Sequence, residues 1–238
     1  MNGSVPLGGL VSLRGVVAVS PKFVASKGSL GACLWGIFVS EPIAQAAAYS
    51  GAIVLASGSR AVADAAGVYG PCPPGTDLIP SDTVAGDAFD VTATAIAYVR
   101  SDCATTTAPP PAPEIRLNNA CAVNRIARGQ RIPTPATVAD VTELTNTATA
   151  AIHAKWTGVL VQLNNVSSQG VVGTTGSIQL TNGVRIRDRI YQATKTALFA
   201  AGTTWSSIVG VGHLDVCAWS LEPRDPCTDF IPKSQNCP

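Results

Sequence analysis

An internal repeat constrains the fold of this chain more than any other feature of its sequence. The stretch VSLRGVVAV at residues 11–19 matches WTGVLVQL at residues 156–163. Further along each half, AGDAFDVTATAIAYV (85–99) matches AGTTWSSIVGVGHL (201–214), and in both an Ala-Gly pair introduces an aromatic side chain, Phe89 or Trp205. A chain of 238 residues is long enough for two domains of roughly 110 residues each, so the repeat predicts two domains of one plan.

Each half contains short runs rich in Val, Ile, Thr and aromatic residues, separated by turns with Gly and Pro, which is typical of β-strands. Five strands with a connector between the third and the fourth is the plan of the OB-fold, a small Greek-key barrel. Gly15, Gly158 and Gly210 fall inside predicted strands, where a small barrel needs tight bends. We therefore predict a mainly β protein of two tandem five-stranded OB-like Greek-key barrels with short helices.

The predicted boundaries are 1–108 for the first barrel, 109–152 for a linker, and 153–238 for the second barrel with a C-terminal tail. The linker is expected to hold one strand at 114–126 and a short helix around 138–144, capped by Thr137. A second short helix is predicted at 193–202, because a glycine stands at its end. A long insertion rich in Gly, Pro and Asp, at 57–83, interrupts the first barrel.

The chain is poor in charge, with 13% charged residues against about 25% in typical soluble domains. Neutral, hydrated strand faces rich in Thr and Ser would explain this, and so would a surface covered by copies of the chain or by a partner, since interface cores are depleted in charge. The net charge of +1 argues against strong non-specific attraction to nucleic acid or anionic membranes. No apolar run approaches the roughly 20 residues of a membrane helix, so membrane insertion is not expected.

Seven cysteines are dispersed without a CxxC pair, and the two histidines, His153 and His213, are not spaced like metal ligands. Neither a metal nor a cofactor is therefore expected. Dispersed cysteines in a loop-rich chain predict disulfides and an oxidising compartment, outside the cell or at its surface. No signal-peptide pattern follows Met1, so if the protein is secreted, its signal was removed before this chain was defined.

Spacing alone does not decide how the cysteines pair. As hypotheses, we pair Cys72 with Cys103, Cys217 with Cys227, and Cys33 with Cys121. Seven is an odd number, so one thiol is left over. Cys237, next to the last residue, is the candidate for a bond to a neighbouring chain.

The stretch VRIRDRIYQ is the most distinctive candidate for ligand binding. In an extended strand, Arg185, Arg187, Arg189 and Tyr191 would share one face, opposite the apolar side chains. The second and third strands of an OB-fold form its usual ligand face, so this ladder would contact phosphates and stack a base. Arg125, Arg128 and Arg131, in the stretch NRIARGQR, are candidates to extend it. A solvated outer face with arginine stems over apolar surface is the alternative interpretation.

Candidates for catalysis are confined to the closing segment WSLEPRDPCTDFIP. Glu222, Asp225 and Asp229 gather there beside Arg224, but proline-locked turns with Arg-Asp pairing also explain them. The chain contains no GxSxG elbow, glycine-rich phosphate loop or HExxH motif. We expect no catalytic residues and no enzymatic activity.

Several motifs resemble paired OB-fold domains of secreted bacterial surface proteins. An aromatic-x-Gly-Val-Leu-Val strand, a Gly-x-x-aromatic-x-x-Ile-x-Gly strand and a closing Leu-x-Pro-Arg segment recur in that family, and stand here at Trp156–Val161, Gly202–Gly210 and Leu221–Asp229. The resemblance covers most of the chain and implies the fold and secretion. Most members of the family are described only as domains of unknown role, and related domains accompany extracellular nuclease modules.

These features together predict a non-catalytic, secreted bacterial protein that acts as a structural or interaction unit at the cell exterior. Its expected partner is a copy of itself, in a homo-oligomer or filament, or another surface protein. The alternative is a module that binds nucleic acid or another anionic polymer through the strand from Arg185 to Tyr191.

Overall fold

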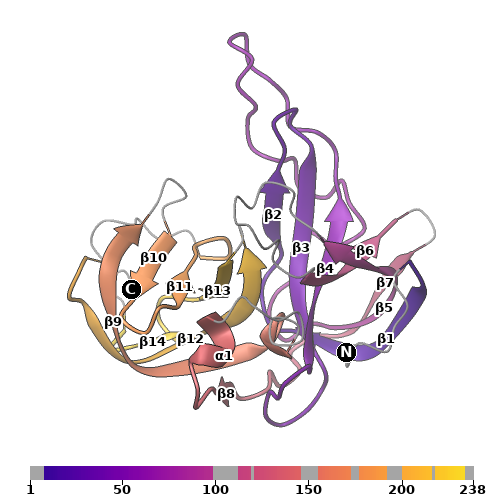
Figure 1. Ribbon diagram of the computed structural model, residues 1–238. Helices are drawn as coiled ribbons and strands as arrows, with labels where there is room; N and C mark the ends of the chain where they lie inside the picture. Colours follow the sequence, from indigo (N-terminus) through magenta and orange to yellow (C-terminus); the bar gives the residue numbers. More distant parts are fainter. Residues whose placement is uncertain are drawn as a thin grey trace.

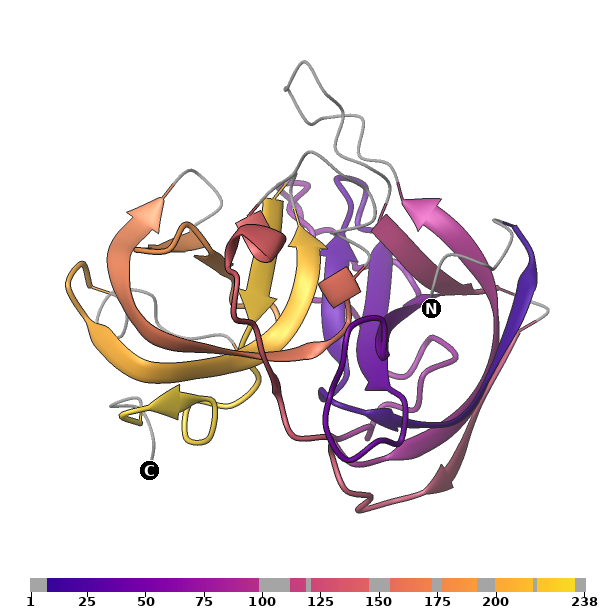
Figure 2. The ribbon, with the colours of Figure 1, turned by 60° about the horizontal axis from the view of Figure 1, so that its bottom comes forward.

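The computed structural model describes residues 8–98, 112–118, 121–145, 155–172, 177–191, 200–215 and 218–233. Two β-barrels lie side by side in it (Figure 1). A view from below shows each barrel as a curved sheet closed on itself (Figure 2). The protein is mainly β, with two closed five-stranded barrels that each carry two extra strands, and this confirms the predicted fold class.

The first barrel closes in the order β1-β3-β4-β6-β5, with β5 pairing back to β1. Its neighbours are antiparallel except β4 and β6, which run parallel. This is the Greek-key arrangement of an OB-fold. The extra strand β2 pairs with β3, and β7 pairs with β5. The seven strands are β1 (Leu10–Ala18), β2 (Phe23–Lys27), β3 (Cys33–Ser40), β4 (Gly51–Ser57), β5 (Ala88–Tyr98), β6 (Ala112–Leu117) and β7 (Ala122–Ala127).

The second barrel repeats this order as β9-β10-β11-β13-β12, with β12 pairing back to β9. Here β11 and β13 are the parallel neighbours. The extra strand β8 pairs with β9, and β14 pairs with β12. The seven strands are β8 (Ala136–Thr137), β9 (Leu160–Val172), β10 (Ser177–Leu180), β11 (Arg185–Ile186), β12 (Thr204–Asp215), β13 (Ala218–Glu222) and β14 (Phe230–Ile231).

The matched stretches of the sequence occupy equivalent places in the two barrels. Strands β1 and β9 are the first of each barrel, and they pair with β5 and β12, which carry the second matched stretch. The bend predicted at Gly15 is present: the register of β1 shifts between Leu13 and Val16, and Gly15 has a φ of 60°. Its N–H donates to Asp90 Oδ1 at 2.9 Å, which satisfies a group that the shifted ladder leaves unpaired.

Strands β3 and β4 are apolar on both faces because both faces are buried. On β3, Ile37 belongs to the interior of the first barrel, whereas Phe38 belongs to a cluster that continues into the second barrel. On β4, Val54 faces inward and Ile53 belongs to the shared cluster. This explains the continuous apolar runs GIFV and AIVLA, which lack the alternation of a strand with one wet face.

The two barrels meet backbone against backbone. A Cβ at Gly51 of β4 would lie 2.1 Å from the carbonyl oxygen of Gly158, just before β9. Close by, the N–H of Tyr49 donates to the carbonyl oxygen of Lys155 at 2.8 Å. The rings of Phe38 and His213 meet edge to face with centroids 5.5 Å apart. The tandem barrels therefore share one packed seam.

The strand pairings correct the predicted boundaries. The first barrel extends beyond residue 108, because β6 closes it between β4 and β5. The single strand predicted at 114–126 is two strands, β6 and β7, which pair with different parts of β5. Since β6 and β7 belong to the first sheet and β8 pairs with β9 in the second, the described part of 109–152 is not a separate linker.

The helical predictions were partly wrong. The helix α1 spans only Thr142–Thr145, and Thr137, the predicted cap, ends β8. Asp140 is the cap, because its Oδ1 accepts hydrogen bonds from the N–H and the hydroxyl of Thr142 at 2.9 and 2.6 Å. The helix predicted at 193–202 lies mostly outside the described residues.

Candidate functional site

The predicted arginine ladder is not present as one strand. Only Arg185–Ile186 forms β11, between β10 and β13. Val184 and Ile186 are fully buried, as the alternation predicts, but residues 187–191 are not extended strand. Tyr191 is half-buried and packs against the shared core, so it does not end a row of arginines.

Two of the ladder arginines contact other parts of the protein. Arg187 donates from Nη1 to the hydroxyl of Ser177 on β10 at 2.9 Å. Arg189 donates from Nη1 to the carbonyl oxygen of Ala25 on β2 at 2.6 Å, and therefore links the second barrel to the first. Its backbone N–H donates to Glu222 Oε2 at 3.3 Å. The ladder geometry predicted from period-two alternation is therefore wrong.

Two of the three arginines proposed to extend the ladder, Arg125 and Arg128, bind carboxylates of the first barrel, whereas Arg131 is exposed. Arg125 donates from Nη2 to Asp82 Oδ1 at 2.7 Å, and its Nε lies 3.1 Å from Asp87 Oδ2. Arg128 also bonds Asp82. The hydrogen bonds from Arg125 and then Arg128 hold the pKa of Asp82 well below its usual range.

Hydrogen bonds to the carboxylate of Asp229 hold the closing segment in a turn. Asp229 is buried, and its carboxylate receives Arg224 Nη2 at 2.6 Å and Nε at 3.1 Å. The backbone N–H groups of Arg224 and Asp225 donate to the same carboxylate at 2.6 and 3.2 Å. Arg224 also donates from Nη1 to the carbonyl oxygen of Val19 in the first barrel at 3.2 Å. The pairing is Arg224 with Asp229, and it holds the turn and the seam together.

The remaining acid of this segment, Glu222, is also fully buried. Its Oε1 accepts a hydrogen bond from the Ser220 hydroxyl at 3.4 Å, and its Oε2 accepts one from Arg189 N–H. Asp225 Oδ1 accepts from Cys227 N–H at 2.7 Å. Each acid that the sequence nominated is therefore engaged in a structural contact.

The structure changes the cysteine pairing. Cys33 on β3 forms a disulfide with Cys72, with Cα atoms 5.7 Å apart. The predicted pairs of Cys72 with Cys103 and of Cys33 with Cys121 are therefore wrong, and the thiol of Cys121 is free. Cys227 is disulfide-bonded. Its predicted partner Cys217, like Cys103 and Cys237, lies outside the described residues.

The disulfide anchors a projection that stands above the two barrels (Figure 1). We define the projection as residues 58–72 of the long insertion, together with the turn at 28–32 between β2 and β3. The ring of Tyr69 packs on Gly31, where a Cβ would lie 2.3 Å from it, and Ala61 N–H donates to the carbonyl oxygen of Gly31 at 2.8 Å. Asp64 Oδ1 accepts from the N–H groups of Ala66 and Val68 at 2.9 and 2.8 Å. These contacts fix the shape of the loop.

The tip of the projection exposes apolar side chains although its backbone is fixed. We define the tip as residues 62–68 with Leu30. Val62 is 82% exposed, Val68 is 63% exposed and Leu30 is 63% exposed. Residues 62–68 read VADAAGV, with Asp64 as the one charged side chain. The sequence shows the insertion itself, but not that its apolar residues would remain in solvent.

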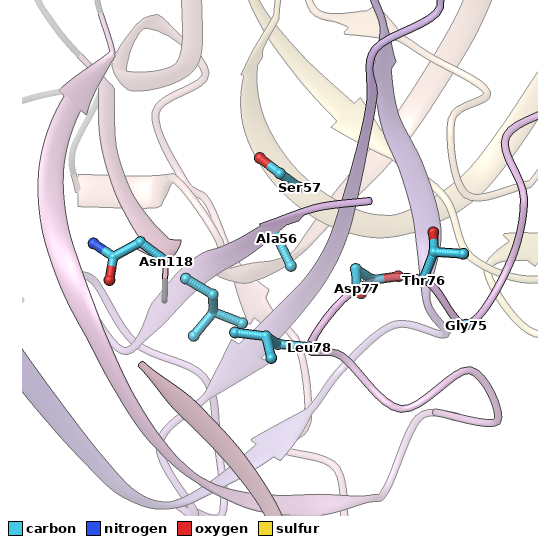
Figure 3. Close-up of a pocket in the computed structure, with 8 residues that line it drawn as sticks. Ala56, Ser57, Gly75, Thr76, Asp77, Leu78 and Asn118 are labelled. Atoms are coloured by element: carbon cyan, nitrogen blue, oxygen red, sulfur yellow. The ribbon is translucent and has the colours of Figure 1, made fainter. Parts of the chain in front are cut away.

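A hollow of about 1050 Å³ lies at the base of the projection (Figure 3). Its lining comes from the ends of the parallel strands β4 and β6 and from the loop that joins β4 to β5, and consists of Ala56, Ser57, Gly75, Thr76, Asp77, Leu78, Leu117 and Asn118. In Figure 3, Asn118 lies on one side, Thr76 and Asp77 on the other, and Ala56 between them. The lining combines the apolar side chains of Ala56, Leu78 and Leu117 with polar ones, which are Ser57, Thr76, Asp77 and Asn118.

The carboxylate of Asp77, the one among these lining residues, forms an ion pair with Lys22. Asp77 Oδ2 lies 2.7 Å from Lys22 Nζ, and the two side chains are 0% and 4% exposed. Asp77 Oδ1 accepts from Ile79 N–H at 2.9 Å, and Lys22 Nζ lies 4.8 Å from the centroid of a ring of Trp35. Among the described residues that line it, the hollow therefore presents no uncompensated charge.

No family model, curated protein or solved structure matches the chain in the three comparisons. The resemblance to tandem OB-fold surface domains thus stays a prediction. Across the described ranges, no three His, Cys, Asp or Glu side chains are grouped as a metal ion would require. No helix in the described part of the chain is long and apolar enough to cross a bilayer.

Proposed function

We propose that the protein is a non-catalytic, secreted structural unit that associates with copies of itself at the cell exterior. The observation that carries this proposal is the projection, which holds Val62, Val68 and Leu30 in solvent on a fixed backbone. Exposed loops that serve no contact are typically polar and mobile. An apolar surface on a fixed loop is typical of a site that binds another protein.

The low charge content supports the same proposal. Charged residues are depleted at the cores of protein interfaces, and this chain has 13% of them. The Cys33–Cys72 disulfide supports secretion, since such bonds persist in oxidising compartments. The structural contacts of Glu222, Asp225 and Asp229 support a role without catalysis.

Nothing in the described structure favours the alternative of nucleic-acid binding. Arg187 and Arg189 bond to Ser177 and Ala25, and Arg125 and Arg128 bond to Asp82. A protein that binds nucleic acid through phosphate contacts would need such groups facing one ligand. We therefore keep this alternative only as an arm of the test.

Size-exclusion chromatography with light scattering over a concentration series tests the proposed function. We expect the mass to rise above 24.3 kDa as concentration increases, and to do so equally at low and high salt, because the contact is apolar. In a parallel arm, fluorescent single-stranded DNA is titrated with the protein at low salt. A particle that stays at the monomer mass, or salt-sensitive DNA binding by the monomer, would contradict the proposal.

A further inference from the structure

We propose that the tip of the projection inserts into the hollow of a second copy, whose own tip inserts into the hollow of the first. This inference rests on the proposed function, because it names the contact through which the chain associates. The tip and the hollow were defined above by residues 62–68 with Leu30, and by the lining at the ends of β4 and β6.

The tip is already in a shape that can bind. Its two sides are joined by Asp64 N–H donating to the carbonyl oxygen of Val68 at 2.9 Å, and by Gly70 N–H donating to that of Val62 at 2.9 Å. Together with the Cys33–Cys72 disulfide, these bonds leave little backbone entropy to lose on association. The exposed valines are therefore available at low cost.

The hollow has the chemistry and the size that such a tip requires. Ala56, Leu78 and Leu117 supply an apolar surface, and Leu78 is 47% exposed at its edge. Ser57 supplies a neutral hydroxyl that can bond the backbone of an entering loop. At about 1050 Å³, the hollow is slightly larger than the roughly 300–1000 Å³ of small-molecule pockets, so it is large enough to receive part of a loop.

The position of the hollow predicts how the two copies are arranged. The hollow lies at the base of the same projection whose far end is the tip, because Ser57 and Gly75 of its lining stand on either side of residues 58–72 in the chain. When two projections lie side by side in opposite directions, each tip reaches the base of the other. Both contacts are then identical, so the assembly has twofold symmetry and closes as a dimer.

Sedimentation velocity of the full chain over a concentration series tests the tip. The variants are Val62→Asp and Val68→Asp, and the control is Val171→Asp, which changes a valine of β9 that is 51% exposed and outside the projection. We expect either tip variant to raise the dimer dissociation constant by roughly 100-fold or more, because each substitution removes a buried valine from both of the symmetric contacts. The control should leave it within about 3-fold of the wild type.

A charge-pair rescue tests the hollow. We expect Val68→Glu and Leu78→Arg to weaken the dimer when each is made alone. In the double variant the new Glu and Arg face each other in both contacts, so association should recover by roughly 10-fold over either single variant. Circular dichroism checks that every variant is folded. A double variant that associates no better than the singles would overturn the tip-to-hollow contact.

The results separate this inference from the proposed function. If the wild type associates and the tip variants associate equally well, the inference fails and the proposed function stands. If the wild type remains a monomer at every concentration, both fail.

Discussion

Lys22 and Asp77, which is part of the lining of the hollow, form a buried ion pair in which Lys22 Nζ lies 2.7 Å from Asp77 Oδ2. A buried charge that loses its partner is left uncompensated, so removing one member costs more than the pair contributes in net terms. We expect Lys22→Met to lower the free energy of unfolding by about 3–5 kcal/mol, as measured by urea denaturation.

An exposed ion pair provides the control for this prediction. Arg14 lies 3.1 Å from Asp90, and its side chain is 73% exposed. Solvent screens such a pair, so Arg14→Ala should lower the free energy of unfolding far less than Lys22→Met. Equal losses in the two variants would show that the Lys22–Asp77 pair is not buried as described.

Glu114 and Glu143 should respond to pH in opposite directions. Burial raises the pKa of Glu114 even though Arg116 opposes the shift, so its contribution to stability is present below its unfolded pKa and is lost as the pH rises. Hydrogen bonds from Lys155 and then Trp156 lower the pKa of Glu143, so its contribution is present above the unfolded pKa and is lost as the pH falls.

The corresponding measurement compares Glu114→Gln and Glu143→Gln with the wild type by urea denaturation at about pH 3 and about pH 7, on either side of the glutamate range. The advantage of the wild type over Glu114→Gln should be larger at the lower pH. Its advantage over Glu143→Gln should be larger at the higher pH. Two variants that change in the same direction would contradict these assignments.

Among the loops, the projection depends on its disulfide. Cys33 and Cys72 are separated by 39 residues, and opening a loop of this length frees the unfolded chain. We expect the double variant Cys33→Ala/Cys72→Ala to lose about 2–5 kcal/mol and to be cleaved within residues 58–72 by limited proteolysis. An unchanged melting temperature and cleavage pattern would show that other contacts suffice to fix the loop.

The sequence predicted those strands whose own residues carry a regular pattern of apolar and polar side chains. The alternation around Phe89 and Val91 places β5 correctly, and the bend at Gly15 follows from a glycine inside an apolar run. The pattern failed at VRIRDRIYQ, because Arg187 and Arg189 bond to Ser177 and Ala25 after β11 has ended. Such contacts join residues far apart in the sequence and leave no local period.

Neither the hollow nor the disulfide could be predicted from the sequence, because both depend on contacts between residues that are far apart in the chain. Cys33 meets Cys72 only because the insertion folds back over β3, where Tyr69 packs on Gly31. The spacing of the cysteines in the sequence does not indicate that the insertion folds in this way. The insertion at 57–83 was the one available signal, and it marked where the projection would begin.

The two barrels should unfold as one body, because their core is continuous from Phe38 to Trp156 and beyond. Gly51 lies at the closest approach, where an added Cβ would meet the carbonyl oxygen of Gly158. We expect Gly51→Ala to cost about 1–3 kcal/mol and to shift both barrels in a single transition. In the exposed turn of the projection, Gly28→Ala has its nearest contact at 3.6 Å and should cost about 0.5 kcal/mol or less.

If the seam were only a loose contact between independent domains, Gly51→Ala would instead separate the unfolding into two transitions. Denaturation followed both by circular dichroism and by hydrogen exchange in each barrel distinguishes these cases. Coincident midpoints support one cooperative unit. Such a unit offers a rigid base for the projection, which association through its tip requires.

Association of the unmodified chain is the property that most directly decides its function. Small-angle X-ray scattering of the purified protein over a concentration series gives the mass and shape of the particle together. We predict that the mass will rise from 24.3 kDa towards twice that value, with a shape in which two molecules lie side by side along their projections. A particle that remains at 24.3 kDa at every concentration would contradict the account.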